Sequence, residues 1–118
     1  MNIKRGDIAL AFYPFASGAG GSRRPVLVLQ SDVYNQRIRN TIVAQITSNL
    51  TRAGDAAHLL IDLATPDGSQ SGLLHNSVVS CLNLATLQDA RLDQVIGHLS
   101  DVLMSKVNDC LQTALGIP

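Results

Sequence analysis

The sequence predicts a mainly β fold that ends in a single amphipathic helix, and three observations support this. Between residues 7 and 99, short apolar runs rich in β-branched residues and Leu alternate with polar, turn-forming residues. From residue 100 onward, apolar side chains instead recur at helical spacing. Aromatic residues make up only 3% of the chain and Trp is absent, so the core must be built from aliphatic side chains.

The chain is 118 residues long and shows neither an internal repeat nor an interdomain linker, so we expect residues 1–118 to form one domain. Its 46% hydrophobic and 15% charged residues are typical of a globular protein and exclude a disordered chain. No apolar run approaches the ~18 residues of a membrane span, and residues 1–5 lack the apolar segment of a signal peptide. We therefore expect a cytoplasmic protein that does not bind a membrane.

The two cysteines, Cys81 and Cys110, match no metal-ligand spacing. In an intracellular protein, two such cysteines are most simply reduced residues of the core. No metal site is readable elsewhere, and because the sequence contains no Glu, carboxylate chemistry would have to use Asp. We expect neither a metal nor another cofactor.

The formal net charge is zero, but the charges are unevenly distributed. Residues 1–52 contain seven Lys or Arg and two Asp, a net charge of +5, whereas residues 53–118 contain two and seven, a net charge of −5. Such an asymmetry indicates a surface that faces a polyanion. The alternative is that the charges interdigitate when the chain folds. The scarcity of aromatic residues argues against a surface on which nucleobases stack.

Two apolar runs, Val26–Leu29 and Thr41–Ile46, predict buried strands. Pro25 has no N–H to contribute to a sheet, which places it at the first residue of its strand. Arg24 then lies at the start of one strand and Thr47 at the end of the other. If the strands are antiparallel neighbours, both residues lie at the same end of the pair, where a guanidinium beside a hydroxyl is suited to hold a phosphate.

The remaining strands are shorter or less regular. Asp7–Phe12 is the first expected strand, and the glycine-rich residues 16–22 after it lack the Gly-Lys-Ser/Thr ending of a nucleotide-binding loop. We interpret this segment as a flap beside Arg23 and Arg24. The other expected elements are a short capped turn within Ser31–Arg39, an edge strand at His58–Ile61, a turn at Pro66–Gly68, a strand from Ser77 to Leu87 and a last strand at Val95–Leu99.

Residues 100–117 predict the clearest element, a helix with one apolar stripe. Ser100 is its expected N-cap, Asp101 favours the positive end of the helix, and Gly116 supplies a left-handed stop. The stripe consists of Leu103, Met104, Val107, Cys110, Leu111, Ala114 and Leu115.

Five segments of the chain stand in the order and spacing of the MazF/PemK toxins: Arg5–Ile8, Arg24–Leu29, Ile42–Ser48, Gly72–Val79 and Ile96–Asp101. The chain resembles this family over nearly its whole length. The resemblance implies an SH3-like β-barrel with a C-terminal helix, the CcdB/MazF-type fold, which usually forms a homodimer. It also implies the toxin half of a type II toxin–antitoxin pair. Such a toxin is a metal-independent endoribonuclease that cuts single-stranded RNA at a short sequence, and its partner is a cognate antitoxin.

By position, the resemblance assigns the catalytic pair to Arg24 and Thr47, and contacts with RNA to Ser22, Arg23, Ser48 and Asn83. Two regions depart from the family pattern. Many members carry Ser-Glu-Gln before the Arg-Pro motif, where this chain has the glycine-rich residues 18–22. Further along, Ala85 stands where the family has an arginine. Both departures bear on which RNA sequence is cut.

Cleavage of RNA through its own 2′-OH requires donors aimed at the phosphate oxygens, where negative charge increases in the transition state. The guanidinium of Arg24 and the hydroxyl of Thr47 suit this role. A guanidinium stays protonated at pH 7, so we do not assign Arg24 as the base. His58 and His75 are candidates for the base, and the alternative is that both are exposed or structurally satisfied histidines.

Two other functions stay open at this point. CcdB-type gyrase poisons resemble this fold without cutting RNA, but their C-terminal Trp-Gly-Ile is Leu115-Gly116-Ile117 here. A degenerate toxin that only binds its antitoxin is the second alternative, and the intact pair of Arg24 and Thr47 argues against it.

Overall fold

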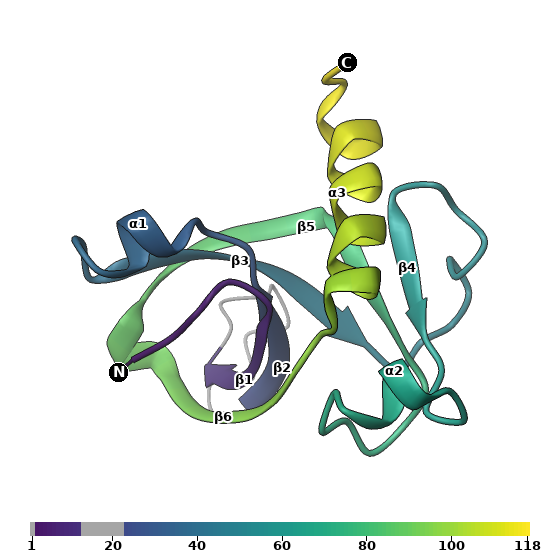
Figure 1. Cartoon of the computed structure of the whole chain (residues 1–118), viewed down its shortest axis with the longest axis horizontal. Helices are drawn as coiled ribbons and strands as arrows, with labels where there is room; N and C mark the ends of the chain where they lie inside the picture. Colours follow the sequence, from purple (N-terminus) through teal and green to yellow (C-terminus); the bar gives the residue numbers. More distant parts are fainter. Residues whose placement is uncertain (1, 13–22) are drawn as a thin grey trace.

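In the computed structural model, which describes residues 2–12 and 23–118, six strands form one antiparallel sheet. The strands are β1 (Asp7–Phe12), β2 (Arg23–Val28), β3 (Asn40–Thr47), β4 (His58–Ile61), β5 (Ser77–Gln88) and β6 (Leu92–His98). Their order across the sheet is β4-β5-β3-β2-β1-β6, which confirms the edge position expected for β4. Figure 1 shows that the sheet is strongly curved, with β5 and β6 bending around β1 and β2.

Four helical segments lie in the described part of the chain: α1 (Asp32–Asn35), α2 (Pro66–Ser69), the 3-10 helix η1 (Asp89–Arg91) and α3 (Asp101–Leu115). The turn predicted at Pro66–Gly68 is wrong, because these residues begin the short helix α2. Thr65 caps this helix by accepting a hydrogen bond from the Gly68 N–H at 3.0 Å. Pro66 is tolerated in the first turn, where the missing N–H has no partner to lose.

Two strands begin two or more residues earlier than the sequence predicts. Pro25 is the third residue of β2, because Arg23 and Arg24 already pair with β1. Pairing with β3 begins only at Val26, so Pro25 lies where β2 has a neighbour on one side only. Similarly, β6 begins at Leu92, which pairs with β1 and is buried.

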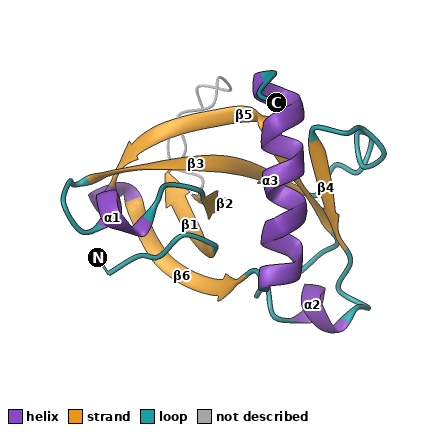
Figure 2. Ribbon diagram, turned by 45° about the horizontal axis from the view of Figure 1, so that its top comes forward, coloured by secondary structure: helices purple, strands orange, loops and turns teal. Residues whose placement is uncertain are grey.

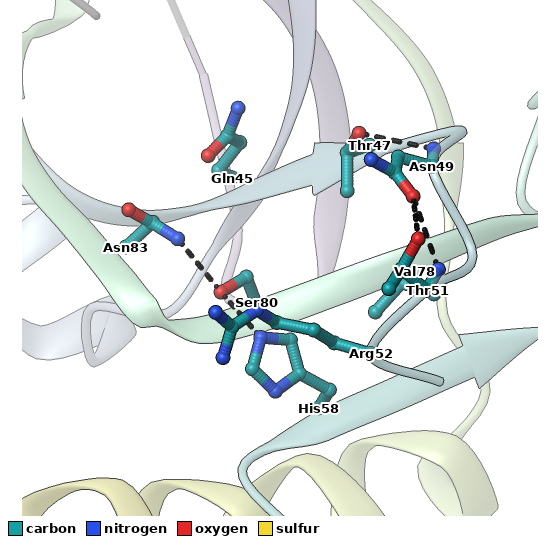
Figure 3. Close-up of a pocket in the computed structure, with 9 residues that line it drawn as sticks. All are labelled: Gln45, Thr47, Asn49, Thr51, Arg52, His58, Val78, Ser80 and Asn83. Atoms are coloured by element: carbon teal, nitrogen blue, oxygen red, sulfur yellow. Dashed lines mark hydrogen bonds between the residues drawn. The ribbon is translucent and has the colours of Figure 1, made fainter. Parts of the chain in front are cut away.

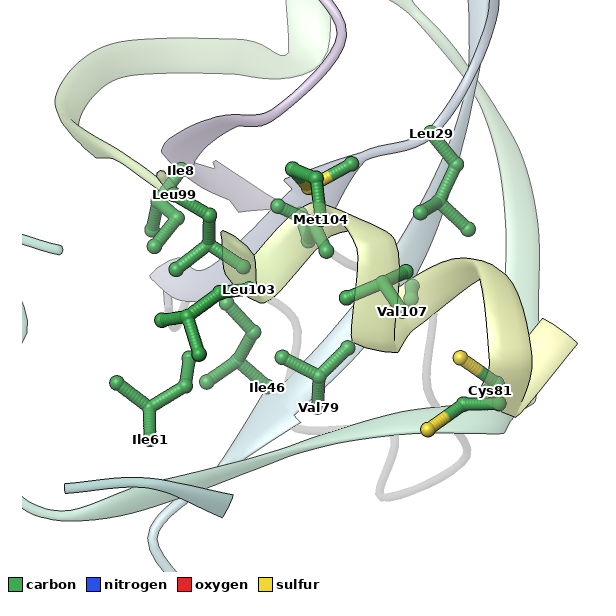
Figure 4. Close-up of a cluster of buried hydrophobic side chains, with 13 residues drawn as sticks. Ile8, Leu29, Ile46, Ile61, Val79, Cys81, Leu99, Leu103, Met104 and Val107 are labelled. Carbon is green, nitrogen blue, oxygen red and sulfur yellow. The ribbon is translucent and has the colours of Figure 1, made fainter. Parts of the chain in front are cut away.

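The sheet separates two apolar clusters because successive residues of a strand face opposite sides. In β1, Ile8 belongs to the cluster that packs against α3, whereas Ala9 belongs to the cluster on the other face. The first cluster (Figure 4) comprises Ile8, Leu27, Leu29, Ala44, Ile46, Ile61, Val79, Cys81, Leu99, Leu103, Met104, Val107 and Cys110. The second comprises Ile3, Ala9, Ala11, Val26, Val28, Val43, Leu87 and Leu92. Among the described residues, neither cluster contains an aromatic side chain, as the composition predicts.

Helix α3 lies across one face of the sheet (Figure 2), and its C-terminal end extends beyond the strands (Figure 1). The predicted caps are confirmed: Ser100 accepts from the Leu103 N–H at 3.2 Å, and Gly116 has a φ of +67°. The stripe is buried at Leu103, Met104, Val107 and Cys110. Leu115 was expected to continue it but is 58% exposed, because the last turn has no sheet beneath it.

Cys81 on β5 and Cys110 on α3 are free, buried thiols, which confirms their expected place in the core. Burial raises the pKa of Cys81 to about 12 and also raises the pKa of Cys110. Because the thiolate is the reactive form, both thiols are inert at neutral pH. Within the described residues, no helix is long and apolar enough to cross a membrane.

Candidate functional site

Strands β2 and β3 bring Arg24 and Thr47 together. The two strands are antiparallel, and Val26 lies opposite Gln45. Continued by two residues, this register places Arg24 opposite Thr47. Both residues line one cavity of about 400 Å³, which we call the Arg24 cavity. The sequence-based expectation that these two residues lie at one end of the strand pair is therefore confirmed.

The Arg24 cavity lies between the ends of β2 and β3, strand β6 and the segment 72–77. Its other lining residues are Leu10, Pro25, Gln45, Ile46, Ser48, Gly72, Leu73, Leu74, His75, Ser77, Gln94 and Ile96. Arg24 is exposed, and its guanidinium makes no ion pair or hydrogen bond with any described residue. Its five donors are therefore not taken up by described residues, which leaves them able to bind an anion.

Thr47 is half-buried at the end of β3. Its Oγ1 accepts a hydrogen bond from the Asn49 N–H at 3.1 Å, which orients the hydroxyl without using its proton. Ser48, the next residue, is exposed and lines the same cavity, as expected for a residue that contacts a ligand there.

Arg23 and Ser22 contribute less to this geometry. Arg23 lines neither of the cavities described here and forms an ion pair with Asp93 of β6, between two exposed side chains. Its charge is therefore partly compensated within the protein. Ser22 and the glycine-rich residues 16–21 lie outside the described residues.

A second cavity, of about 280 Å³, adjoins the first and shares Gln45 and Thr47 with it. We call it the His58 cavity. Figure 3 shows its lining residues, which come from β3, the loop that follows it, β4 and β5: Gln45, Thr47, Asn49, Thr51, Arg52, His58, Val78, Ser80 and Asn83. Asn83, a predicted RNA contact, is exposed and lines the His58 cavity rather than the Arg24 cavity.

The described residues that line the two cavities include two arginines, Arg24 and Arg52, and no Asp. Both arginines come from the basic residues 1–52. The positive charge is confined to the lining itself, because Asp55 lies beside His58 and interacts with Arg52, and Asp93 pairs with Arg23. Within residues 2–12 and 23–118, no group of three or more His, Cys or Asp side chains could hold a metal ion.

A chain of hydrogen bonds runs from the protein surface into the His58 cavity. His58 Nδ1 lies 2.6 Å from Asp55 Oδ2, and His58 Nε2 lies 3.0 Å from Ser80 Oγ. Ser80 Oγ in turn accepts a hydrogen bond from Asn83 Nδ2 at 2.9 Å. Three segments supply these residues: the loop before β4, β4 itself and β5. We call this set the Asp55–Asn83 chain.

The hydrogen bond from His58 lowers the pKa of Asp55, and the backbone N–H of Ala57 lowers it further. Asp55 is therefore ionised at neutral pH and acts only as an acceptor. His58 must then carry its proton on Nδ1 and accept at Nε2 when it is neutral. The sequence did not single out Asp55 or Ser80. One available signal was Ser80, a polar residue within the apolar run of residues 78–82.

The three histidines have different environments. His58 is buried and both ring nitrogens are engaged. His98 is exposed and its Nδ1 lies 2.9 Å from Asp7 Oδ1, at the opposite end of β1 from the residue that pairs with Arg24. His75 alone lines the Arg24 cavity, and its ring makes no hydrogen bond with a described residue. Of the two histidines that the sequence offers as candidate bases, His75 lines the Arg24 cavity, whereas His58 is buried with both ring nitrogens engaged.

Comparison with known proteins agrees with this architecture. The profile of the PemK-like, MazF-like toxins of type II toxin–antitoxin systems matches residues 4–115. The Bacillus subtilis protein named Endoribonuclease EndoA is 35% identical over 118 residues, which cover 99% of this chain and 97% of that protein. Endoribonuclease MazF of Staphylococcus saprophyticus is 32% identical over 98% of this chain and 92% of its own length.

A solved structure described as a mycobacterial endoribonuclease in complex with its cognate antitoxin superimposes with a TM-score of 0.77. It is 23% identical in sequence and covers 98% of this chain and 97% of its own, so it supports the fold. The predicted mainly β fold with a C-terminal helix is thereby confirmed as the MazF type. The chain belongs to the family of PemK-like, MazF-like toxins of type II toxin–antitoxin systems.

Proposed function

We propose that this toxin is a metal-independent endoribonuclease that cuts single-stranded RNA at a short sequence. The observation that carries the proposal is that Arg24 and Thr47 line one cavity, to which the described residues contribute no carboxylate. The similar proteins of B. subtilis and S. saprophyticus are both named endoribonucleases, which supports it further.

In the proposed reaction the 2′-oxygen of a ribose attacks the adjacent phosphorus. The new O2′–P bond forms while the P–O5′ bond breaks, which yields a 2′,3′-cyclic phosphate and a 5′-hydroxyl end. Arg24 donates hydrogen bonds to the phosphate oxygens as their charge increases, and the Thr47 hydroxyl adds a second donor. These donors lie on the ends of two paired strands, so little reorganisation is needed when the substrate binds.

The 2′-OH must lose a proton, and we assign His75 as the base that accepts it. Imidazole accepts protons near neutral pH. His75 lines the Arg24 cavity, and the Ser77 hydroxyl holds its backbone by donating to the His75 carbonyl oxygen at 2.8 Å. His58 is unsuited to the role, because Asp55 and Ser80 occupy both of its ring nitrogens.

Replacement of His75 by Gln should lower kcat on the order of 10²-fold, the usual contribution of a general base. It should leave KM close to the wild-type value, because the substitution removes the proton acceptor and no phosphate contact. His98→Gln is the matched control, since His98 pairs with Asp7 and lines neither cavity. A kcat of His75→Gln equal to that of wild type would exclude His75 as the base.

The proposed activity is tested directly with purified protein and RNA oligonucleotides of mixed sequence in excess EDTA. We expect cleavage to persist, and the products to carry cyclic phosphate and 5′-hydroxyl ends. Loss of cleavage in EDTA that Mg²⁺ restores would contradict the metal-independent reaction. If no RNA is cut but the protein binds an antitoxin, the degenerate toxin is the correct alternative, and inhibition of gyrase would instead indicate the CcdB-like function.

We also propose that the protein acts as a homodimer that binds a cognate antitoxin. A single small sheet offers a shallow surface, and RNA several nucleotides long needs a wider one. Light scattering at micromolar concentration should therefore give a mass about twice the 12.6 kDa of the chain. A mass equal to one chain would contradict this assembly while leaving the fold unaffected.

A further inference from the structure

Gln45 lines both cavities, and the proposed chemistry does not use it. Among the described residues, Gln45 and Thr47 are the two that the Arg24 cavity and the His58 cavity share. We propose that Gln45 determines RNA sequence preference by forming hydrogen bonds to the edge of an adenine next to the cleaved phosphate. The inference deepens the proposed function and rests on it.

The register of the sheet places Gln45 directly behind Thr47. Successive residues of a strand face opposite sides, so Gln45 and Thr47 share one face of β3, roughly 7 Å apart along the strand. Gln45 lies opposite Val26, and the same register, continued by two residues, places Thr47 opposite Arg24. A phosphate bound by Arg24 and Thr47 therefore has the Gln45 side chain beside it, where the base of a flanking nucleotide lies.

The amide of Gln45 is available to a ligand. The side chain is half-buried and makes no hydrogen bond with a described residue, and Figure 3 shows none to the other residues that line the His58 cavity. Every buried side-chain N or O atom in the described part of the chain has a partner, so both amide atoms of Gln45 are accessible. Other polar side chains at this cavity instead bond to one another, as the Thr51 hydroxyl does by donating to Asn49 Oδ1 at 2.6 Å.

An interruption of the β3–β5 ladder opens space beside Gln45. On β5, Ser80 lies opposite Gln45 but Leu84 lies opposite Ala44, so residues 81–83 have no partner on β3. Extra residues of this kind bend their strand and redirect its side chains. The His58 cavity lies at this irregularity, next to the Gln45 amide.

The chemistry of an amide favours a base edge over a phosphate. An amide presents donors next to an acceptor, whereas phosphate oxygens only accept and would leave the Gln45 carbonyl without a partner. The cationic donors that suit a phosphate are already supplied by Arg24 and Arg52. Gln45 is therefore the residue of this surface that is suited to read a base.

Adenine is the base whose edge matches a glutamine amide. It presents the N6 amino group beside the N7 acceptor, and a glutamine binds both atoms at once. Guanine has two acceptors at the same edge, and the pyrimidines have no N7. In single-stranded RNA this edge is open to a protein side chain. We therefore expect wild type to prefer adenine at one position next to the cleaved bond.

The test begins with sequencing of the 5′-hydroxyl ends that wild type and Gln45→Met produce from a randomised RNA library. Gln45→Met keeps the length of the side chain without the amide, and should reduce the adenine preference about tenfold at that position alone. Gln88→Met is the matched control and should leave the profile unchanged, because Gln88 is an exposed glutamine of β5 that lines neither cavity.

A modified substrate isolates the contact with N7. Replacing the preferred adenosine by 7-deazaadenosine removes the N7 acceptor and keeps the amino group, so kcat/KM of wild type should fall about fivefold. Gln45→Met should cut the two RNAs at equal rates. The wild-type measurement keeps the test valid if Gln45→Met fails to fold.

Three results would overturn the inference: no adenine preference in wild type, equal wild-type kcat/KM for the two RNAs, or a loss in Gln45→Met that is uniform over all sequences. If wild type cuts no RNA, the proposed function fails and fluorescence anisotropy with oligo(A), oligo(C) and oligo(U) decides the inference. Tighter binding of oligo(A) that is lost in Gln45→Met would support it. Equal affinities for the three, or no binding of RNA, would contradict it.

Discussion

Replacement of Arg24 by Ala is expected to abolish RNA cleavage while leaving the fold intact. Arg24 lines the cavity with Thr47, and its guanidinium has no partner among the described residues. The substitution therefore removes hydrogen bonds to the bound phosphate and none within the described part of the protein. Removal of an arginine that stabilises a phosphoryl transition state costs on the order of 10³-fold or more in rate. Single-turnover cleavage measures this loss, and circular dichroism and light scattering should stay at wild-type values.

Two further substitutions define the site around Arg24. Thr47→Ala should lose less, on the order of 10²-fold, as expected for one neutral donor to a developing charge. Arg23→Ala is the control: Arg23 pairs with Asp93 and lines neither cavity, so it should weaken RNA binding in a salt-dependent way and spare the chemical step. If Arg24→Ala cuts RNA as fast as wild type, the assigned site is wrong.

Replacement of Gly97 by Ala is expected to destabilise the protein severely and to disrupt the site with it. Gly97 belongs to β6, and a Cβ there would lie 2.0 Å from the Ser71 carbonyl oxygen and 2.8 Å from the Gly72 nitrogen. Both are backbone atoms, which cannot move aside cheaply. We expect a loss of about 3 kcal/mol or more in the free energy of unfolding, the upper range for overpacking.

The same contact positions the Arg24 cavity, because the segment 72–77 that follows Ser71 supplies part of its lining, including His75. Urea denaturation of Gly97→Ala measures the stability loss, and RNA cleavage by the folded fraction should fall with it. Gly54→Ala is the matched control: a Cβ there meets no atom within 4 Å, so its stability should stay within about 0.5 kcal/mol of wild type. An unchanged denaturation midpoint for Gly97→Ala would contradict the close approach of β6 to this segment.

The sequence by itself determined the elements whose signals are local. The alternation in Asp7–Phe12 and the stripe and caps of residues 100–116 predict β1 and α3 because side-chain period and capping chemistry depend only on near neighbours. The juxtaposition of Arg24 and Thr47 was also predictable. Each flanks an apolar run, and antiparallel pairing of those two runs places them at one end. Local pattern and one pairing rule were therefore enough to predict that these two residues lie together.

Tertiary structure alone decided the features that depend on contacts between distant residues. Leu115 has the spacing of a core residue but lies where α3 extends beyond the sheet, which no periodicity predicts. Arg23 meets Asp93, 70 positions away, because β1 lies between β2 and β6 and pairs with both.

The Asp55–Asn83 chain follows the same principle. His58 had equal standing with His75 as a base until the fold buried it between Asp55 and Ser80 and left His75 on the Arg24 cavity. Ser80 is a polar residue among apolar neighbours. Its hydroxyl can reach His58 only because β4 and β5 pair in a register that places the two residues opposite each other. Burial then requires each polar group to find a partner, and the register of the two strands decides which one.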